Sequence, residues 1–348
     1  MVYYNRLRSV EPKESPRVAA KLIRLREELR NQKIPPRTVN DTLLLATWNI
    51  REFGAPKPKY GGRIPESFYY IAEILSAFDL VAVQEVNGDL KDLRTLMGIL
   101  GGNWDYIATD VTEGRSGNSE RMAFLYDSHK VSFQSIAGEI VLPETKLIAG
   151  TKQFSRTPFA VAFQSGWFKF MLCTVHIYYG AASGTKFERR VKEIKSIGTF
   201  LAKRAKEEDY NYILLGDFNV VTPTCETMYA LEGSGFEIPA ELKRPTNVEE
   251  DKFYDQISFK TRAGELRLGD SPVNAGIFNY YKAVFKDDEF DAYKEYVKAT
   301  EAGYSRYGIE KRKEYYETWR TFQMSDHYPL WVELKIDFSK DYLAGLAR

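Results

Sequence analysis

Residues 324–334, MSDHYPLWVEL, place an acidic side chain and an imidazole directly before an apolar run. The run YPLWVELKI (328–336) is rich in β-branched and aromatic residues and predicts a buried strand. Asp326 and His327 therefore stand at the start of that strand, where a half-buried polar group must be hydrogen-bonded, paired or metal-bound. A loop aspartate that caps the backbone beside a packed histidine would satisfy the same rule. Other residues of the chain decide between these two readings.

Six further short runs, rich in β-branched and aromatic residues, predict strands of the same kind. Several are nearly continuous apolar runs, as expected for strands that are buried on both faces. They span residues 42–50, 78–86, 121–127, 159–166, 168–179 and 211–221. Helical spacing lies between them, at roughly 65–77, 88–100 and 186–208. The pattern predicts an α/β fold in which mixed β-sheets carry helices on their outer faces.

The N-terminal part of the chain predicts a helix that precedes this alternation. Residues 16–32 carry apolar side chains at helical spacing, after the start signals Ser15 and Pro16. The segment KIPPRT ends the pattern. We therefore expect residues 1–40 to form a helical extension that packs on a main domain spanning 41–340.

Residues 278–320 stand apart because they are rich in tyrosine and in charged residues. They predict two helices with a break near Gly303 and Gly308. We expect a helical insertion at the surface of the main domain, close to the face that carries the functional residues. A lid or a substrate-contacting arm is the alternative interpretation.

The composition is that of a globular domain, with 44% hydrophobic and 28% charged residues. Because the net charge is only +1, binding to a polyanion must come from a local patch. The two cysteines, Cys173 and Cys225, are too few for a disulfide framework, and we expect them to be unpaired. No apolar run approaches the roughly 20 residues of a membrane span, and the N-terminus lacks an apolar signal-peptide core. We expect a soluble monomer, cytoplasmic by default.

Polar side chains occur where the apolar runs end or begin. Each one alone has an ordinary explanation, because turns favour Asn and Asp. Their recurrence at almost every run is harder to explain in that way, and open α/β folds bind ligands at strand ends. The residues concerned are Asn49, Glu85, His176, Asp217, Asn219, Asp326 and His327.

The mixture of side chains indicates a metal and a phosphate. Glu85 and Asp326 are hard oxygen donors, which suit Mg²⁺, Mn²⁺ or Ca²⁺. Zinc would need more His or Cys ligands than a chain with three histidines offers. Arg156, in FSRTPF, can fork two phosphate oxygens, and the imidazoles can donate to developing charge.

Asp217 and Asn219 can orient and deprotonate a water molecule. The sequence contains no Gly-x-Ser-x-Gly motif and no cysteine placed as a nucleophile. Direct attack by a metal-assisted water is therefore favoured over a covalent intermediate.

Eight motifs occur in the order found in the endonuclease/exonuclease/phosphatase superfamily, and they most resemble its deoxyribonuclease I branch. They are TWNIREFG, VQEV, SERMAFLYD, FSRTPFAVAF, TVHIYYG, LLGDFN, YDQI and SDHYPLWVEL. The resemblance runs from about residue 42 to 337. It implies a four-layer sandwich of two β-sheets flanked by helices, and hydrolysis of phosphoesters with Mg²⁺, Mn²⁺ or Ca²⁺.

The resemblance also implies roles for single residues, beginning with the metal. Glu85 resembles the principal metal ligand, Asn49 lies beside it, and Asp326 would complete the metal and water site. His176 and His327 resemble the two histidines that flank the scissile phosphate.

Two carboxylates match those that pair with these histidines, Glu120 with His176 and Asp255 with His327. Such a pair fixes the tautomer and raises the basicity of the imidazole.

The remaining matches concern the water and the substrate. Asp217 resembles the water-orienting acid, Asn219 the phosphate-binding amide and Arg156 the arginine that contacts the DNA backbone. Asn49 and Asn118 complete the expected substrate-binding set. Asn118 stands where the branch has a tyrosine that helps to hold the phosphate, so substrate preference is open.

These matches predict a divalent-metal-dependent endonuclease that acts on DNA. Arg156, Arg51 and Arg115 are the candidates for local phosphate contacts. A hydrolase of smaller phosphoesters, such as phosphoinositides or sphingomyelin, is the alternative on the same fold, and a catalytically inactive interaction module is the third. His129, in YDSHKV, matches no motif and is predicted to be a turn residue.

Overall fold

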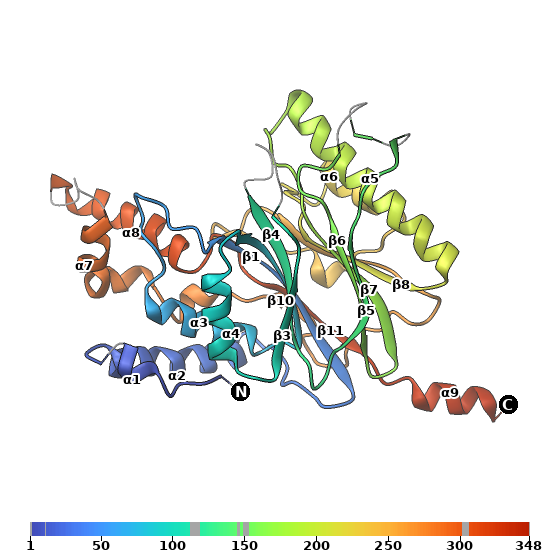
Figure 1. Cartoon of the computed structure of the whole chain (residues 1–348), viewed down its shortest axis with the longest axis horizontal. Coiled ribbons are helices and arrows are strands. Elements are labelled where there is room, and N and C mark those ends of the chain that lie inside the picture. The colour runs from blue at the N-terminus through green and yellow to red at the C-terminus, as the bar shows by residue number, and fades with distance from the viewer. Residues whose placement is uncertain are drawn as a thin grey trace.

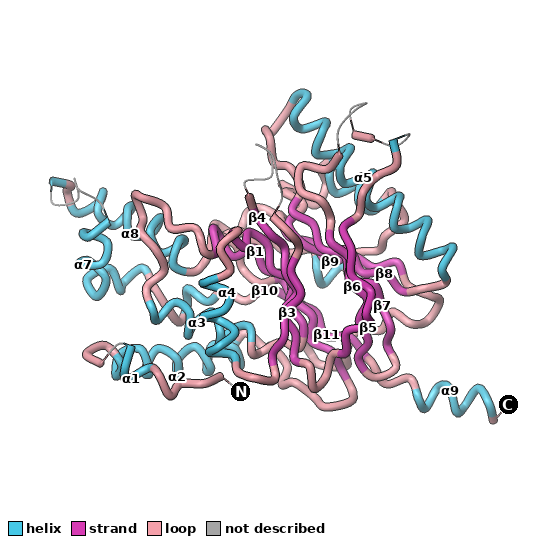
Figure 2. Tube along the Cα trace, viewed as in Figure 1, coloured by secondary structure: helices cyan, strands magenta, loops and turns pink. Residues whose placement is uncertain are grey.

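The computed structural model describes residues 2–10, 12–111, 119–144, 147–148, 153–300 and 306–347. Two mixed β-sheets pack face to face, and helices lie on the outer side of each (Figure 1). Coloured by secondary structure, the strands form the centre of the molecule and the helices lie to either side (Figure 2). The predicted α/β four-layer sandwich is confirmed.

The first sheet has six strands in the order β10-β11-β1-β2-β4-β3. β1 and β2 run parallel, and the other neighbours run antiparallel. The strands are β1 (Thr42–Phe53), β2 (Leu80–Asn87), β3 (Trp104–Ala108), β4 (Glu120–Asp127), β10 (Ala275–Ile277) and β11 (Leu330–Lys335).

The second sheet has five strands in the order β5-β6-β7-β8-β9. β7 and β8 run parallel, and the other neighbours run antiparallel. The strands are β5 (Ser132–Glu139), β6 (Phe159–Ser165), β7 (Phe168–His176), β8 (Asn211–Asp217) and β9 (Asp255–Lys260).

The helices form the two outer layers. On the side of the first sheet lie α1 (Leu7–Val10), α2 (Ser15–Asn31), α3 (Pro65–Leu75), α4 (Lys91–Leu100), α7 (Phe290–Thr300) and α8 (Ile309–Gln323). On the side of the second sheet lie α5 (Gly184–Glu208) and α6 (Glu226–Glu232), while α9 (Ser339–Leu346) extends away from the body (Figure 1).

β1 shows why its sequence is an almost unbroken apolar run. Leu44 and Trp48 face the core between the first sheet and its helices, whereas Leu43 and Leu45 face the core between the two sheets. All four side chains have no exposed surface. Successive residues of a strand point to opposite faces, so a strand buried on both sides must be apolar throughout.

Residues 278–320 contribute to the core of the molecule as well as to its surface. Phe285, Tyr293 and Trp319 are buried in the core on the helical side of the first sheet. Glu289 forms ion pairs with side chains of α2, including Lys21 at 2.7 Å. This segment therefore cannot be removed without opening the core. Gly308 precedes α8, and Gly303 lies outside the described residues.

Several elements were not apparent from apolar patterning, among them β3, β5, β9, β10, α6 and α9. β5 is exposed along almost its whole length, so no apolar alternation marks it. His129 lies in an exposed turn, as predicted. Cys173 and Cys225 are unpaired. In the described part of the chain, no helix has the length and apolarity to cross a membrane.

Candidate active site

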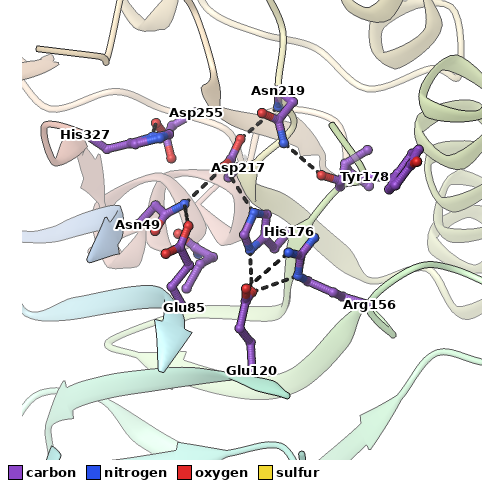
Figure 3. Close-up of polar contacts among 12 residues, drawn as sticks. Asn49, Glu85, Glu120, Arg156, His176, Tyr178, Asp217, Asn219, Asp255 and His327 are labelled. Carbon is purple, nitrogen blue, oxygen red and sulfur yellow. Dashed lines mark hydrogen bonds and ion pairs between the residues drawn. The ribbon is translucent and has the colours of Figure 1, made fainter. Parts of the chain in front are cut away.

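The strand ends that carry polar residues meet at one edge of the sandwich. The parallel pairs β1–β2 and β7–β8 bring their carboxyl ends to this edge. β4, β9 and β11 run antiparallel to their neighbours, so their amino ends arrive at the same place. Figure 3 shows the resulting cluster of carboxylate, amide and imidazole side chains.

Asn49 lies at the centre of the part of this cluster that could hold a metal ion. Its Nδ2 atom donates to Glu85 Oε1 at 2.9 Å and to Asp217 Oδ2 at 3.1 Å. Its Oδ1 atom is buried and has no hydrogen-bond partner. The second oxygen of Glu85 accepts from the backbone N–H of Glu52 at 2.8 Å. Asn49 thus leaves one buried acceptor open beside a carboxylate.

Two residues of the cluster have left-handed backbone conformations, which are uncommon for residues other than glycine. Glu85 has φ 60° and lies where the register of β2 shifts against both neighbours. Asn219 has φ 53°, and its backbone N–H donates to Asp217 Oδ1 at 2.8 Å. The side-chain amide of Asn219 donates to the carbonyl of Ile177, and buried Arg190 donates to the backbone carbonyl of Asn219. Neighbouring contacts therefore hold each strained residue in place.

His176, Glu120 and Arg156 form a buried charged group. His176 Nδ1 lies 2.9 Å from Glu120 Oε2, although without the angle needed for a hydrogen bond. Arg156 forks the same carboxylate through Nε at 2.7 Å and Nη2 at 3.1 Å. Burial disfavours the charged form of Glu120, but His176 and Arg156 outweigh it and lower the pKa of Glu120 to about 2. Its carboxylate is therefore ionised at neutral pH.

Asp217 occupies the position between the two histidines (Figure 3). Its Oδ2 atom lies 3.5 Å from His176 Nε2. Burial raises the pKa of Asp217, and the charge of Asp255 raises it further, while the two histidines oppose the shift. A buried carboxylate with a raised pKa is a suitable general base.

His327 and Asp255 form the second imidazole–carboxylate pair. The distance between His327 Nδ1 and Asp255 Oδ2 is 2.7 Å, and the ring stacks on Tyr254 with centroids 5.4 Å apart. Burial lowers the pKa of His327, but Asp255, Asp217 and Asp326 outweigh burial and raise it well above its ordinary value. His327 is therefore held as a cation at neutral pH.

Three contacts of the cluster join one sheet to the other. Asn49 of β1 meets Asp217 of β8, and Glu120 of β4 meets His176 of β7. His327, just before β11, meets Asp255 of β9. The cluster thus lies on the seam between the sheets.

Ser325 supports both halves of the site, and sequence analysis did not single it out. Its hydroxyl donates to the carbonyl of Asn49 at 2.6 Å. The same oxygen accepts from the backbone N–H groups of Arg51 and His327. The phenol of Tyr280, in the helical insertion, donates to the carbonyls of Ser325 and His327. Ser325 directly precedes Asp326 and His327 in the SDHYPLWVEL motif, and this position was the signal by which the sequence could have indicated its role.

Other predicted residues are placed differently. Asp326 is partly exposed and pairs with Arg51 at 3.3 Å. Arg156 is 8% exposed and its guanidinium is committed to Glu120. Asn118 and Arg115 lie outside the described residues.

The side chains near Glu85 provide few but suitable donors for a divalent cation. Within the described ranges, no three His, Cys, Asp or Glu side chains are arranged to hold a metal by themselves. The open Oδ1 of Asn49 next to the Glu85 carboxylate still offers two hard oxygens. Mg²⁺ is commonly held by one or two carboxylates, with waters and substrate phosphate completing the shell. The residues therefore fit Mg²⁺ or Mn²⁺.

A cavity of about 580 Å³ opens beside His327, between the loop at residues 247–254 and α8. Arg51 and Arg320 line it, but each is already paired, with Asp326 and Asp287 respectively. Its lining also includes Asn247, Glu249, Tyr254, Glu314, Glu317, Asp326 and His327. Among the described residues, the charged side chains of its wall that lack an ion-pair partner are therefore mainly carboxylates.

Comparisons with solved structures show the same fold. An endonuclease/exonuclease/phosphatase family protein from Bacteroides thetaiotaomicron is 17% identical, with a TM-score of 0.53 over 85% of this chain and 98% of that chain. Mannosyl-6-phosphatase Bt3783 of the same organism is 16% identical, with a TM-score of 0.53 over 84% and 99%. ANGEL2, a 2′,3′-cyclic phosphatase, is 12% identical, with a TM-score of 0.51 over 88% and 99%.

No curated protein matches the chain. A family model matches residues 46–230, which is more than half of the chain and includes most of the residues in the cluster. The chain therefore belongs to the endonuclease/exonuclease/phosphatase family.

Proposed function

We propose that the chain hydrolyses phosphoesters by direct attack of a water molecule that Asp217 deprotonates. The observation that carries this proposal is the placement of Asp217, a buried carboxylate with a raised pKa beside His176 and Asn49. A general base needs a pKa near the working pH and a position within reach of the water. Membership of a family of nucleases and phosphatases supports the reaction class.

The two histidines would hold the phosphate from either side. The imidazolium of His327, maintained by Asp255, can donate to a non-bridging oxygen and stabilise negative charge as the phosphorus is attacked. His176 is held by Glu120 on one side and faces Asp217 on the other. One N–H of the Asn219 amide is committed to the Ile177 carbonyl, and the second remains for substrate.

Glu85 and Asn49 would hold Mg²⁺ or Mn²⁺, with Ca²⁺ as a further candidate. When bound there, a divalent cation supplies positive charge that neutralises the phosphate oxygens and favours attack. Asp326, which pairs with Arg51, would take part through water or substrate.

DNA is the substrate that the sequence motifs favour, with the protein acting as a monomeric endonuclease. Arg51, at the rim of the site, would supply a phosphate contact by leaving Asp326. With few such contacts, binding should depend weakly on salt, since each adds only about −0.9 to the slope of log K against log salt. Arg156 would reach DNA only by leaving Glu120.

The cavity beside His327 favours the second candidate, a smaller phosphoester. Glu249, Glu314 and Glu317 line it, and none of them forms an ion pair within the described ranges. A wall of this charge repels a polyanion and accepts hydrogen bonds from a neutral, hydroxyl-bearing group. Two proteins of the same fold are named for smaller substrates, a mannosyl-6-phosphatase and a 2′,3′-cyclic phosphatase.

The deciding experiment compares supercoiled plasmid, single-stranded DNA, RNA, bis(p-nitrophenyl) phosphate and a hexose 6-phosphate, each with Mg²⁺ or Mn²⁺ and with chelator. Nicking of plasmid at many sites, lost on chelation and in Asp217→Asn, supports the endonuclease. Turnover of the hexose phosphate with intact DNA supports the smaller substrate. If folded, metal-loaded protein turns over none of these esters, the result contradicts phosphoester hydrolysis.

A further inference from the structure

A second cavity lies behind the catalytic turn, on the helical side of the first sheet. Its volume is about 310 Å³, and it is lined by the N-terminal segment, α3, α4 and the loop before α3. The backbone N–H of Tyr3 donates to the carbonyl of Ile99 at 2.7 Å and so holds the N-terminal segment over it. The size falls at the lower end of the range of small-molecule sites.

The charges of this cavity all have one sign. Three arginines line it, Arg6 from the N-terminal segment, Arg63 from the loop before α3 and Arg94 from α4. The residues described around it include no Asp or Glu. Neither Arg63 nor Arg94 forms an ion pair in the described part of the chain. Such a cavity attracts anions.

The rest of the lining is mainly apolar and aromatic. Tyr3, Phe68 and Tyr69 supply rings, and Ile99 adds an aliphatic side chain. Gly98 leaves part of the α4 wall without a side chain, and a Cβ added there would meet no atom within 4 Å. The complementary ligand therefore has an anionic head and a compact apolar body.

Arg63 connects this cavity with the catalytic turn. Its guanidinium donates to the carbonyls of Arg51, Glu52 and Met324. Glu52 in turn donates its N–H to Glu85. The Nε atom of Arg63 is buried without a hydrogen-bond partner, and burial lowers the pKa of Arg63 to about 10. Asp92 and Glu85 partly oppose this shift, and an incoming anion would stabilise the charged form of Arg63 further.

We propose that this cavity is an effector site for small organic anions, such as an aryl or alkyl phosphate, and that Arg63 transmits its occupancy to the metal-binding turn. Fixing Arg63 fixes the carbonyls of Arg51 and Glu52, and through them the orientation of the Glu85 carboxylate. An anion in the cavity should therefore raise the affinity for Mn²⁺, and Mn²⁺ should raise the affinity for the anion by the same factor.

The probe is phenylphosphonate, whose carbon–phosphorus bond is not an ester and is not hydrolysed by this chemistry. Binding is measured by isothermal titration of metal-free protein. Gly98→Leu fills the cavity from a helical position that favours leucine over glycine, and Gly98→Ala is its size control. Arg94→Gln removes one cation, and His327→Ala removes a phosphate donor from the catalytic site only.

We expect phenylphosphonate to bind His327→Ala and Gly98→Ala like the unaltered protein. Arg94→Gln should weaken binding at least about fivefold, as loss of a charge-assisted contact predicts, and Gly98→Leu should weaken it further. The neutral analogue benzyl alcohol should bind at least about tenfold more weakly. Binding that is lost in His327→Ala but kept in Gly98→Leu, or equal binding of the neutral analogue, would overturn the proposal.

The transmission is tested by titrating Mn²⁺ with and without saturating phenylphosphonate. Mn²⁺ affinity should rise about fivefold or more in the unaltered protein, the lower end of typical coupling between sites. It should not change in Gly98→Leu, in which direct contact of the phosphonate with the metal would still occur. An equal rise in both proteins, or no rise in either, would refute an effector role. Neither readout uses turnover, so the result is independent of the proposed hydrolase activity.

Discussion

The Oδ2 atom of Asp255 lies 2.7 Å from the Nδ1 atom of His327, although Asp255 begins β9 in one sheet and His327 precedes β11 in the other. The carboxylate raises the pKa of the imidazole well above its ordinary value despite burial. A group whose pKa is raised by folding stabilises the protein fully below its unfolded pKa, about 6.5 for histidine. That contribution is lost as the pH rises through the folded value.

Asp255→Asn should shift the whole pH profile of turnover to lower pH. The substitution removes the charge that raises the pKa of His327, so the imidazolium is lost at a lower pH and the alkaline limb moves down. The same charge raises the pKa of Asp217, so the acid limb moves down as well. Histidine signals in an NMR titration report His327 directly. Movement of neither limb would show that the pair does not set the active protonation state.

Glu120→Gln should lower both turnover and stability while leaving Mn²⁺ affinity nearly intact. The glutamine leaves Arg156 without its counter-charge in a buried site, which should cost about 3–5 kcal/mol at neutral pH. Because the folded pKa of Glu120 is depressed to about 2, its contribution is present above its unfolded pKa and is lost as pH falls through the folded value. The stability difference between the two proteins should therefore shrink below about pH 4. A comparable loss of metal affinity would place Glu120 among the metal ligands instead.

Asp217→Asn should reduce turnover by about 10²–10⁴-fold, the usual contribution of a general base. Substrate binding should persist, because the amide keeps the shape of the carboxylate. Asp209→Asn is the matched control, because Asp209 follows α5 at the other end of β8 from Asp217. Its turnover should equal that of the unaltered protein. Turnover close to normal in Asp217→Asn would assign water activation to another group.

Glu85→Gln should weaken Mn²⁺ binding at least about tenfold, since the substitution removes the carboxylate to which both Asn49 and the backbone of Glu52 donate. The size and the left-handed backbone of the residue stay the same, so folding should be retained. Glu139→Gln, on exposed β5, controls for the loss of one negative charge. Unchanged binding in the titration would remove Glu85 from the ligand set.

Combined replacement of Glu314 and Glu317 by glutamine should change substrate preference rather than chemistry. The double variant removes two negative charges from the wall of the cavity beside His327. The KM for plasmid should fall several-fold, while turnover of bis(p-nitrophenyl) phosphate should stay the same. Glu310→Gln, on the same helix but outside the cavity lining, is the control. A fall in kcat for the small ester would show that these carboxylates act on the reaction itself.

The sequence predicted the fold well because most of its strands are buried on two faces. The runs that became β1, β2 and β8 are apolar throughout, and their ends carry Asn49, Glu85 and Asp217. β5 was missed because its side chains are exposed, and exposure leaves no periodic apolar signal.

Contacts between segments that are distant in the sequence were harder to predict. The pairing of Asp255 with His327 followed from the family motifs, whereas the commitment of Arg156 to Glu120 depends on packing between β4 and the loop before β6. The position of Arg63 between the catalytic turn and a second cavity likewise depends on tertiary structure. Local sequence patterns report burial and turn chemistry, but they do not report which partner a polar group finds.

Because the contacts Asn49–Asp217, Glu120–His176 and Asp255–His327 bridge the seam between the sheets, each sheet alone carries only part of the site. A folding intermediate with only one sheet formed should be inactive, even if its secondary structure is complete. The turnover rate should therefore depend strongly on the distance between the two sheets. Truncation of a side chain in the core between them, such as Phe163→Ala or Leu172→Ala, would slow the reaction from a distance, without contact with any reacting group.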